Sequence, residues 1–211
     1  MEKIKTAILV SGGGMNLQAI IDAHVFGEIP NCELTAVISS APDVYALTRA
    51  KGANIPCYVV EYNLFPNIQT FNTAMMQKLE DLDIELVVLA GYIYPISTAI
   101  KKAYENKIIN THPTLLPAFE NTNGATAEPY ESAIRTGVKL SGATAYFVNE
   151  SNAPIILQQA VEVWEGDTPM TLQRRIMEEA EWKILPKAMA LYCQKRLNIE
   201  NGIVHIIREN Q

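Results

Sequence analysis

The sequence predicts an α/β fold built on a doubly wound, mostly parallel sheet with an antiparallel edge. Short runs rich in Ile and Val alternate with longer segments of helical period throughout the first half of the chain. The run 86–90 is apolar without interruption, which is typical of a strand covered on both faces. Two later strand-like runs, 143–148 and 155–164, are separated only by residues 149–154, and this short connection favours an antiparallel pair.

Five strands are expected in the first half, at 6–10, 34–38, 57–60, 86–90 and 107–111. The connecting helices are expected around Leu17, Ile20 and Ile21, at 44–51 before Gly52, and at 71–82. Thr168 as a cap and Pro169 at the first helical position predict a long helix over 168–195. Pro186 should kink or divide that helix, because proline lacks the N–H group that the helix needs. Since no linker or repeat interrupts the chain, residues 1–211 are expected to form a single domain.

The composition argues against several classes of function. The chain has a formal net charge of −6 and no Lys/Arg cluster suited to nucleic acid or to an anionic membrane. Cys32, Cys57 and Cys193 are far apart and odd in number, so we expect free thiols in a reducing compartment and no metal site. The sequence contains neither a signal peptide nor a run of about 20 apolar residues. We therefore expect a cytoplasmic protein.

The loop after the first strand, Ser11 to Asn16, contains three consecutive glycines. Glycines let the backbone turn tightly and present N–H groups, and a helix N-terminus adds partial positive charge, so an anion is a natural ligand. Leu17 stands where a dinucleotide-binding loop needs its third glycine, and the loop lacks the lysine of a P-loop. The spacing therefore favours a monophosphate over a dinucleotide. A glycine-rich turn without a ligand is the alternative.

Two further features follow expected strands, at the sheet edge where open parallel sheets bind ligands. The apolar loop 91–96 could hold a flat heterocycle, although packing against a helix explains it nearly as well. Asn110 and His112 are two residues apart and should project from the same face of a strand. The amide can donate to a carbonyl oxygen and the imidazole can carry a proton. A purely structural histidine is the alternative.

Four segments resemble the phosphoribosylglycinamide formyltransferases, a family of folate-dependent formyltransferases. They are Ser11–Ile21, Val88–Tyr92, Ile109–Pro117 with its Asn-Thr-His-Pro-Thr-Leu-Leu-Pro run, and Pro154–Gln158. The resemblance runs in order over nearly the whole chain. It implies transfer of a formyl group from 10-formyltetrahydrofolate, as co-substrate and without a metal, to the amine of glycinamide ribonucleotide in purine synthesis.

The resemblance also implies roles for individual residues. His112 matches the catalytic proton donor, and Asn110 matches the residue that binds the formyl oxygen. The substrate-binding residues that it implies are Gly13, Gly14, Met15, Asn16 and Glu181, with the loop holding the phosphate and Glu181 contacting the nucleotide. The co-substrate-binding residues that it implies are Ile93, Tyr94, Pro95, Ile96 and Asn110, along the pterin.

The chain also departs from the family pattern. Ser151 aligns with the Asp that supports the catalytic His, and Ser cannot supply a negative charge to raise the pKa of His112. Glu150 lies next to it and could take over this catalytic role if the shorter loop turns inward. Ile68 and Tyr94 replace arginines, and Met15 replaces a serine. The segment Phe119–Pro129 is longer than in the family and lacks its histidine.

Three hypotheses remain open. The first is a working formyltransferase acting on small-molecule substrates. The second is a diverged paralogue that binds a phosphorylated ligand with weak or no turnover, which the missing Asp favours. The third is a formyltetrahydrofolate hydrolase, which is less expected because such hydrolases usually carry an N-terminal regulatory domain and this sequence begins at the first strand. A homodimer is possible, but the sequence does not decide the oligomeric state.

Overall fold

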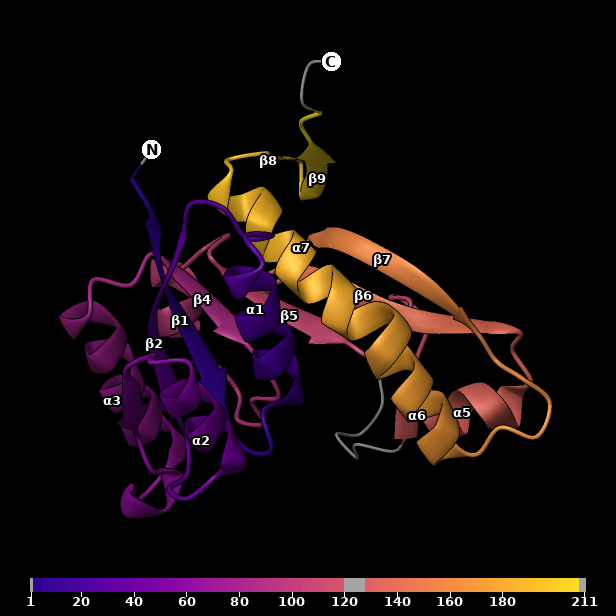
Figure 1. Ribbon diagram of the computed structural model, residues 1–211, viewed down its shortest axis with the longest axis horizontal. Helices are drawn as coiled ribbons and strands as arrows, with labels where there is room; N and C mark the ends of the chain where they lie inside the picture. The colour runs from indigo at the N-terminus through magenta and orange to yellow at the C-terminus, as the bar shows by residue number, and fades with distance from the viewer. Residues whose placement is uncertain (1, 120–127, 209–211) are drawn as a thin grey trace.

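A computed structural model describes residues 2–119 and 128–208 of the chain. Its centre is a seven-stranded sheet with the strand order β3-β2-β1-β4-β5-β6-β7 (Figure 1). The strands are β1 (Ile4–Val10), β2 (Cys32–Ser39), β3 (Cys57–Val59), β4 (Leu86–Leu89), β5 (Ile108–His112), β6 (Leu140–Phe147) and β7 (Ile155–Glu162).

Seven α-helices were assigned in the described residues: α1 (Met15–Val25), α2 (Tyr45–Gly52), α3 (Ile68–Asp81), α4 (Thr98–Ala103), α5 (Glu128–Thr136), α6 (Pro169–Ile176) and α7 (Trp182–Cys193). A 3₁₀ turn (Tyr62–Leu64) precedes α3, and a π-helical turn (Met177–Glu181) joins α6 to α7. A separate hairpin follows α7 and consists of β8 (Leu197–Glu200) and β9 (Ile203–Ile206).

The strand pairing confirms the fold class predicted from the sequence. Strands β1 to β5 pair in parallel, and β6 and β7 continue the sheet in antiparallel fashion. The strand order reverses between β1 and β4, because β2 and β3 lie on one side of β1 and β5 lies beyond β4. The loops that follow β1 and β4 therefore leave the sheet at the point where such folds bind ligands.

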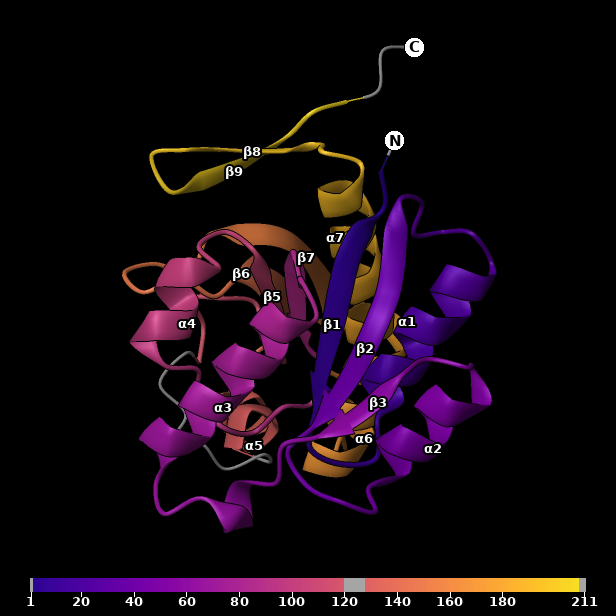
Figure 2. The same cartoon turned by 90° about the vertical axis from the view of Figure 1, so that its left-hand side faces the viewer.

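Alternate residues of the strands face two separate apolar layers. Ile8 and Ile109 pack with residues of α1, α2, α6 and α7, whereas Leu9 and Ile108 pack with residues of α3 and α4. Figure 2 shows α3 and α4 on one side of the sheet and α1 and α2 on the other. This alternation decides to which side each residue at the end of β5 points.

The predicted division of the helix at Pro186 was wrong, since Pro186 lies inside an unbroken α7. The irregularity comes earlier, at the π turn, where Glu181 ends one element and Trp182 begins the next. Proline costs a helix the hydrogen bond to the carbonyl four residues back, which here belongs to Trp182, the first residue of α7. The missing bond falls next to a turn whose hydrogen bonds already deviate from the α pattern, so the helix continues.

The elements that were not predicted are α4, α5, the 3₁₀ turn, the π turn and the β8–β9 hairpin. The hairpin lies beyond the end of α7, apart from the seven-stranded sheet (Figure 2). It packs against the core through Leu197, Ile199 and Val204. Within residues 2–119 and 128–208, no helix has both the length and the apolar composition to cross a membrane.

Candidate active site

A pocket of about 440 Å³ lies over the carboxyl ends of β1, β4 and β5. It is formed by the loops after β1 and β4, by the end of β5, and by side chains from α5, α6 and the π turn. Its lining residues are Gly12, Gly13, Gly14, Met15, Asn16, Ala90, Gly91, Tyr92, Ile93, Asn110, Thr111, Pro113, Tyr130, Gln173, Met177 and Glu181. The pocket thus brings together three features that the sequence analysis placed at strand ends.

The glycine loop forms one wall of the pocket and leads directly into α1. Gly14 caps α1 in the left-handed conformation, with φ 72° and ψ 36°, and a Cβ atom there would lie 2.7 Å from Cβ of Ala46. Only glycine fits this position without strain. The first intrahelical bond runs from the N–H of Gln18 to the Gly14 carbonyl, and no side chain caps the helix. The N–H groups of its first turn are therefore placed to bind an anion.

Arg49 of α2, which the sequence analysis did not single out, braces this loop from outside the pocket. Its Nε donates to the carbonyl oxygen of Gly13 at 2.9 Å, and its Nη1 donates to Oε1 of Gln18 at 2.9 Å. Its Nη2 lies 3.1 Å from the sulfur of Met15. The guanidinium holds the loop in place and adds positive charge beside it, so the loop suits a phosphate electrostatically as well as by shape.

The end of β5 divides the site into two sides. Asn110 and His112 lie on the face of Ile108, toward α3 and α4, and Thr111 lies on the opposite face, toward α1 and α7. The Asn110 amide donates to the hydroxyl of Tyr146, 3.0 Å away on β6, which fixes its orientation. Because the amide nitrogen carries two hydrogens, one remains for a ligand in the pocket.

His112 is oriented by Thr114. The Thr114 hydroxyl donates to the carbonyl oxygen of Ala118 at 2.7 Å, and Nδ1 of His112 lies 2.9 Å from the same hydroxyl oxygen. Since the single hydroxyl proton is directed at Ala118, Nδ1 must carry a hydrogen and donate it to Thr114. Nε2 is then the ring nitrogen that gains or loses a proton. His112 itself is half-buried and is not among the residues that line the described pocket.

The segment after His112 is fixed by a second set of hydrogen bonds. The Thr144 hydroxyl donates to the carbonyl oxygen of Thr114 and accepts from the N–H of Leu116. The side-chain amide of Gln158, from β7, donates to the carbonyl of Leu116 and to the Thr144 hydroxyl. Both antiparallel strands therefore contribute to the position of the His112–Thr114 pair.

Glu181 lines the pocket on the side of α1 and α7, and this residue is only 7% exposed. Burial raises the pKa of Glu181 to about 7, and hydrogen bonds with Thr111 and Asn16 only partly oppose this rise. Burial likewise raises the pKa of Tyr130, which α5 contributes to the pocket. The carboxyl group can therefore change its protonation state near neutral pH.

The stretch expected to bind the co-substrate is only partly in this pocket. Ile93 lines it and is 71% exposed. Tyr94 instead stacks on Tyr62 with ring centroids 4.2 Å apart, and Ile96 is buried in the apolar layer of α3 and α4. The Pro95 carbonyl accepts a hydrogen bond from the Asn72 side chain. Ile93 and Asn110 are thus the two residues of this predicted set that line the described pocket.

The geometry argues against the catalytic role expected for Glu150. Its carboxylate pairs with Lys102 of α4 at 3.4 Å, and the Glu150 side chain is 42% exposed. Because Ile109 pairs with Phe147, the chain leaves β6 beyond the amino end of β5, whereas His112 lies at the carboxyl end. Ser151, in the same turn, is exposed. Among the described residues, Thr114 places a neutral hydroxyl beside Nδ1 of His112.

Residues 120–127 of the segment Phe119–Pro129 lie outside the described residues. Elsewhere in the described chain, no group of three or more His, Cys, Asp or Glu side chains is arranged to hold a metal ion.

The residues around the site that sequence reasoning missed include Arg49, Thr111, Thr114, Tyr130, Tyr146, Gln173 and Met177. Thr111 and Thr114 could have been found, since they flank His112 in a segment stiffened by prolines. Arg49, Tyr146 and Gln173 come from other elements and carry no local signal. Their position depends on the sheet order and on helix packing.

The sequence profile described as "Formyl transferase" matches residues 4–189, which include every one of these pocket residues. The chain belongs to the formyl transferase family.

Solved and curated formyl transferases resemble this chain over almost all of its length. The crystal structure of glycinamide ribonucleotide transformylase 1 from Symbiobacterium toebii superposes with a TM-score of 0.89 at 39% identity, and covers 98% of this chain and 95% of that one. Phosphoribosylglycinamide formyltransferase of Haemophilus influenzae is 35% identical over 204 residues, which are 96% of this chain and 93% of that protein.

Other relatives are much longer. The human trifunctional purine biosynthetic protein adenosine-3 is 37% identical over 213 residues, which are 99% of this chain and 20% of that protein. This formyl transferase chain therefore spans about a fifth of the length of that relative.

Proposed function

We propose that this chain transfers a formyl group from 10-formyltetrahydrofolate to the primary amine of glycinamide ribonucleotide. The observation that carries the proposal is the single pocket in which an anion-binding glycine loop, the Asn110 amide and the buried Glu181 carboxyl face one another. The names of the relatives from Symbiobacterium toebii and Haemophilus influenzae point to the same small-molecule reaction. We also propose that 1–211 forms one domain and acts in the cytoplasm, as the sequence analysis expects.

The acceptor half of the pocket supports a phosphorylated amine. The N–H groups at the start of α1 and the charge of Arg49 suit the phosphate, and Glu181 suits a group that donates hydrogen bonds or carries positive charge. An acceptor held at both ends would present its amine near the end of β5. Holding it there removes much of the entropic cost of bringing two reactants together.

The donor half supports the formyl end of the co-substrate. The donor supplies an activated formyl group attached to nitrogen. Asn110 has one amide hydrogen available to a formyl oxygen, and the exposed Ile93 beside Gly91 offers an apolar surface to a flat ring. Asn110 and Ile93 are therefore suited to the formyl end of the co-substrate.

Asn110 and His112 then have complementary tasks. The Asn110 amide stabilises the negative charge that develops on the formyl oxygen, and its fixed bond to Tyr146 means that little reorientation is needed. His112, with Nδ1–H held by Thr114, can give a proton from Nε2 to a leaving nitrogen. This division agrees with the roles that the family resemblance implies.

A spectrophotometric assay with 10-formyltetrahydrofolate tests the proposal. Absorbance should change only when glycinamide ribonucleotide is added, and His112→Ala should lower the rate on the order of 10²–10⁴-fold. Turnover without the amine would instead identify a hydrolase. Ribonucleotide binding without any turnover would identify a diverged paralogue.

A further inference from the structure

The loop after β1 and the loop after β4 line different parts of the pocket. In the proposed reaction the first holds the phosphate of the acceptor, and the second presents Ile93 to the donor. Strands β1 and β4 pair in parallel as far as Leu9 and Leu89, and one further bond joins the N–H of Ala90 to the Leu9 carbonyl. Beyond that point the two segments separate into different loops, so the sheet no longer sets the distance between them.

A serine hydroxyl bridges the two loops. The N–H of Ile93 donates to Oγ of Ser11 over 3.2 Å. Among the hydrogen bonds found in residues 2–119 and 128–208, this one alone joins the glycine loop to the loop after β4. Ser11 is half-buried and is not among the residues that line the pocket. Its hydroxyl is therefore placed to act on the loops and not on a ligand.

Ser40, which directly follows β2, holds the Ser11 hydroxyl in place. The Ser40 hydroxyl donates to Oγ of Ser11 at 2.7 Å, and Ser40 is only 2% exposed. The backbone N–H of Ser40 donates to the Val10 carbonyl, which fixes Ser40 beside the end of β1. A hydroxyl oxygen has two lone pairs, and Ser40 and Ile93 use both of them here. The bridge is thus anchored to the buried end of β2.

Each loop also has an anchor that does not involve Ser11. Arg49 of α2 holds the glycine loop. Asn72 of α3, which is buried, holds the loop after β4: its side chain donates to the Pro95 carbonyl at 3.1 Å and accepts from the N–H of Ser97 at 3.0 Å. Neither anchor extends from one loop to the other.

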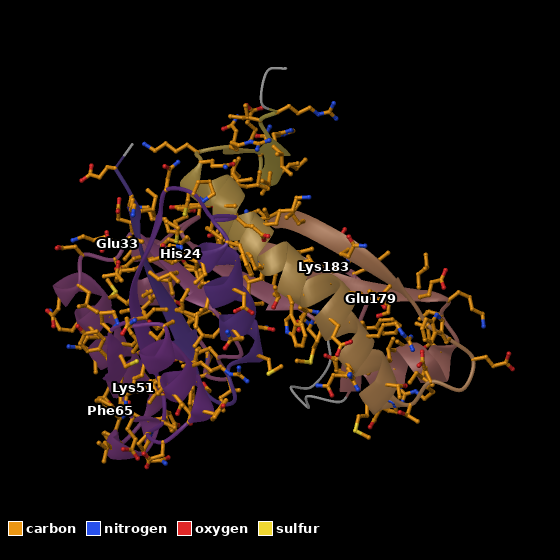
Figure 3. All side chains as sticks on the ribbon, in the orientation of Figure 1. His24, Glu33, Lys51, Phe65, Glu179 and Lys183 are labelled. Carbon is orange, nitrogen blue, oxygen red and sulfur yellow. The ribbon has the colours of Figure 1, made fainter. Side chains whose placement is uncertain are left out.

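An aromatic cluster holds the loop after β4 on the side of α3. Tyr94 stacks on Tyr62, and the Phe71 ring contacts both. Phe65, which is labelled in Figure 3, packs edge-on against Phe71 with ring centroids 5.8 Å apart. Loss of the Ser11 hydroxyl should therefore leave each loop folded and change mainly the distance between them.

We propose that Ser11 is a positioning residue, whose hydroxyl sets the distance between the acceptor-binding loop and the donor-binding loop and so aligns the amine with the formyl carbon. This inference rests on the proposed function. The attacking nitrogen must approach the formyl carbon to about 3–3.5 Å, and a misplacement of about 1 Å can cost on the order of 10²-fold in rate. The bridge then contributes to kcat more than to the binding of either reactant.

Steady-state kinetics of Ser11→Ala tests this role. Alanine removes the bridge, so kcat should fall on the order of 10- to 10²-fold. KM for glycinamide ribonucleotide and KM for 10-formyltetrahydrofolate should each stay within about threefold, because both binding halves keep their anchors. Ser11→Thr retains a hydroxyl and should restore most of kcat. Ser40→Ala keeps Ser11 but removes the bond that anchors it, and should lower kcat by a smaller factor.

Ser97→Ala is the matched control. Ser97 lies just after the same loop and caps α4, where its hydroxyl accepts from the N–H of Ile100. Loss of the cap should lower the melting temperature, but the bridge stays intact and kcat should remain that of the wild type. If Ser97→Ala lost as much kcat as Ser11→Ala, the effect would be a general loosening of the loop, and the inference would fail.

Amide hydrogen exchange measures the bridge itself, without substrates. The hydrogen bond to Ser11 slows exchange at Ile93, so Ser11→Ala should speed it roughly two- to tenfold, which corresponds to the loss of one hydrogen bond. The amide of Ala90, which donates to the Leu9 carbonyl, is an internal control and should exchange as in the wild type.

Three further results would overturn the inference: an unchanged kcat in Ser11→Ala, a loss confined to KM, or an unchanged exchange rate at Ile93. The second would mean that Ser11 only supports the binding of one reactant. If the wild type showed no amine-dependent turnover, the proposed function itself would fail. That outcome is read from the wild type alone, whereas the exchange rate at Ile93 still shows whether the bridge exists.

Discussion

The Nδ1 atom of His112 lies 2.9 Å from Oγ1 of Thr114, and the Thr114 hydroxyl donates onward to the carbonyl of Ala118. This chain of hydrogen bonds selects one tautomer of the imidazole without a negative charge. A carboxylate in the same place would also raise the pKa of the ring, whereas a hydroxyl only orients it. Among the described residues, a hydroxyl therefore orients the histidine where the resemblance implies an acid.

The role of Thr114 can be measured with Thr114→Val and Thr114→Ser. Valine removes the acceptor for Nδ1–H, and a misplaced ring should lower kcat on the order of 10²-fold with KM little changed. Serine retains the hydroxyl and should restore most of the rate. Equal rates in all three proteins would show that Thr114 does not position His112.

Glu150→Gln should leave kcat and KM close to those of the wild type. Glu150 forms an ion pair with Lys102 at the far end of β5, and exposed ion pairs contribute little. Steady-state kinetics decides the matter. A large loss of kcat would revive the interpretation of Glu150 as the supporting acid.

Gly14→Ala should destabilise the protein and weaken phosphate binding. The left-handed backbone alone costs an alanine about 1–2 kcal/mol, and its Cβ would press on Ala46. Gly13→Ala is the matched control for folding, because a Cβ there meets nothing within 4 Å and its φ is not positive. Urea unfolding of the two variants, with and without inorganic phosphate, separates stability from binding.

The free energy of unfolding should also depend on the protonation state of Glu181. Its folded pKa of about 7 exceeds the usual value, so the wild type loses stability as the pH rises from about 4.5 through 7, on the order of 3 kcal/mol in all. Glutamine does not titrate and should not show this loss. Glu181→Gln should therefore gain in free energy of unfolding relative to the wild type between pH 5 and pH 8. A difference that is constant with pH would mean that the carboxyl titrates normally.

The buried pair of Asp167 and Arg175 should matter more for stability than for activity. Two bonds of 2.7 Å join them, and the guanidinium lies 3.5 Å from the centroid of the Trp164 ring. Asp167→Asn leaves a buried cation without its partner and should cost roughly 3 kcal/mol. The Arg175 guanidinium holds the pKa of Asp167 well below its usual range. The stability that Asp167→Asn loses relative to the wild type should therefore be greatest above about pH 4. It should shrink as the pH falls further, because Asp167 of the wild type then becomes protonated.

Asp83→Asn is a suitable control for that measurement. Asp83 pairs with Lys5, but the two side chains are 82% and 41% exposed, and such surface pairs add little stability. If both variants lost the same stability, burial would not distinguish the two pairs.

The sequence was sufficient for the parts of the fold that depend on local pattern. The apolar runs from β1 to β5 and the cap formed by Thr168 and Pro169 carry their own periodic or capping signals, and the structure confirms them. The short α4 and the small β8–β9 hairpin are too short for a period to stand out. The π turn is a property of helix packing, and Pro186 misled because its missing bond falls beside that turn.

The residues of the site likewise fall into those with a local sequence signal and those without one. Gly14, Asn110 and Glu181 were predicted and all line one pocket, whereas Tyr94 was placed with them but packs against Tyr62. Contacts such as Asn110 with Tyr146 depend on the register between β5 and β6, which no local pattern encodes. The position of Glu150 away from His112 also depends on strand pairing, because the turn after β6 lies at the amino end of β5.

A strand that turns Asn110 and His112 one way and Thr111 the other acts as a partition. Each reactant then meets mainly the side chains on its own side of β5, and both sides open into the one pocket. Substitutions such as Tyr94 for an arginine can accumulate on one side of β5 while the residues on the other side still bind their ligand. Evolution could in this way exchange one reactant of the pair and leave the recognition of its companion intact.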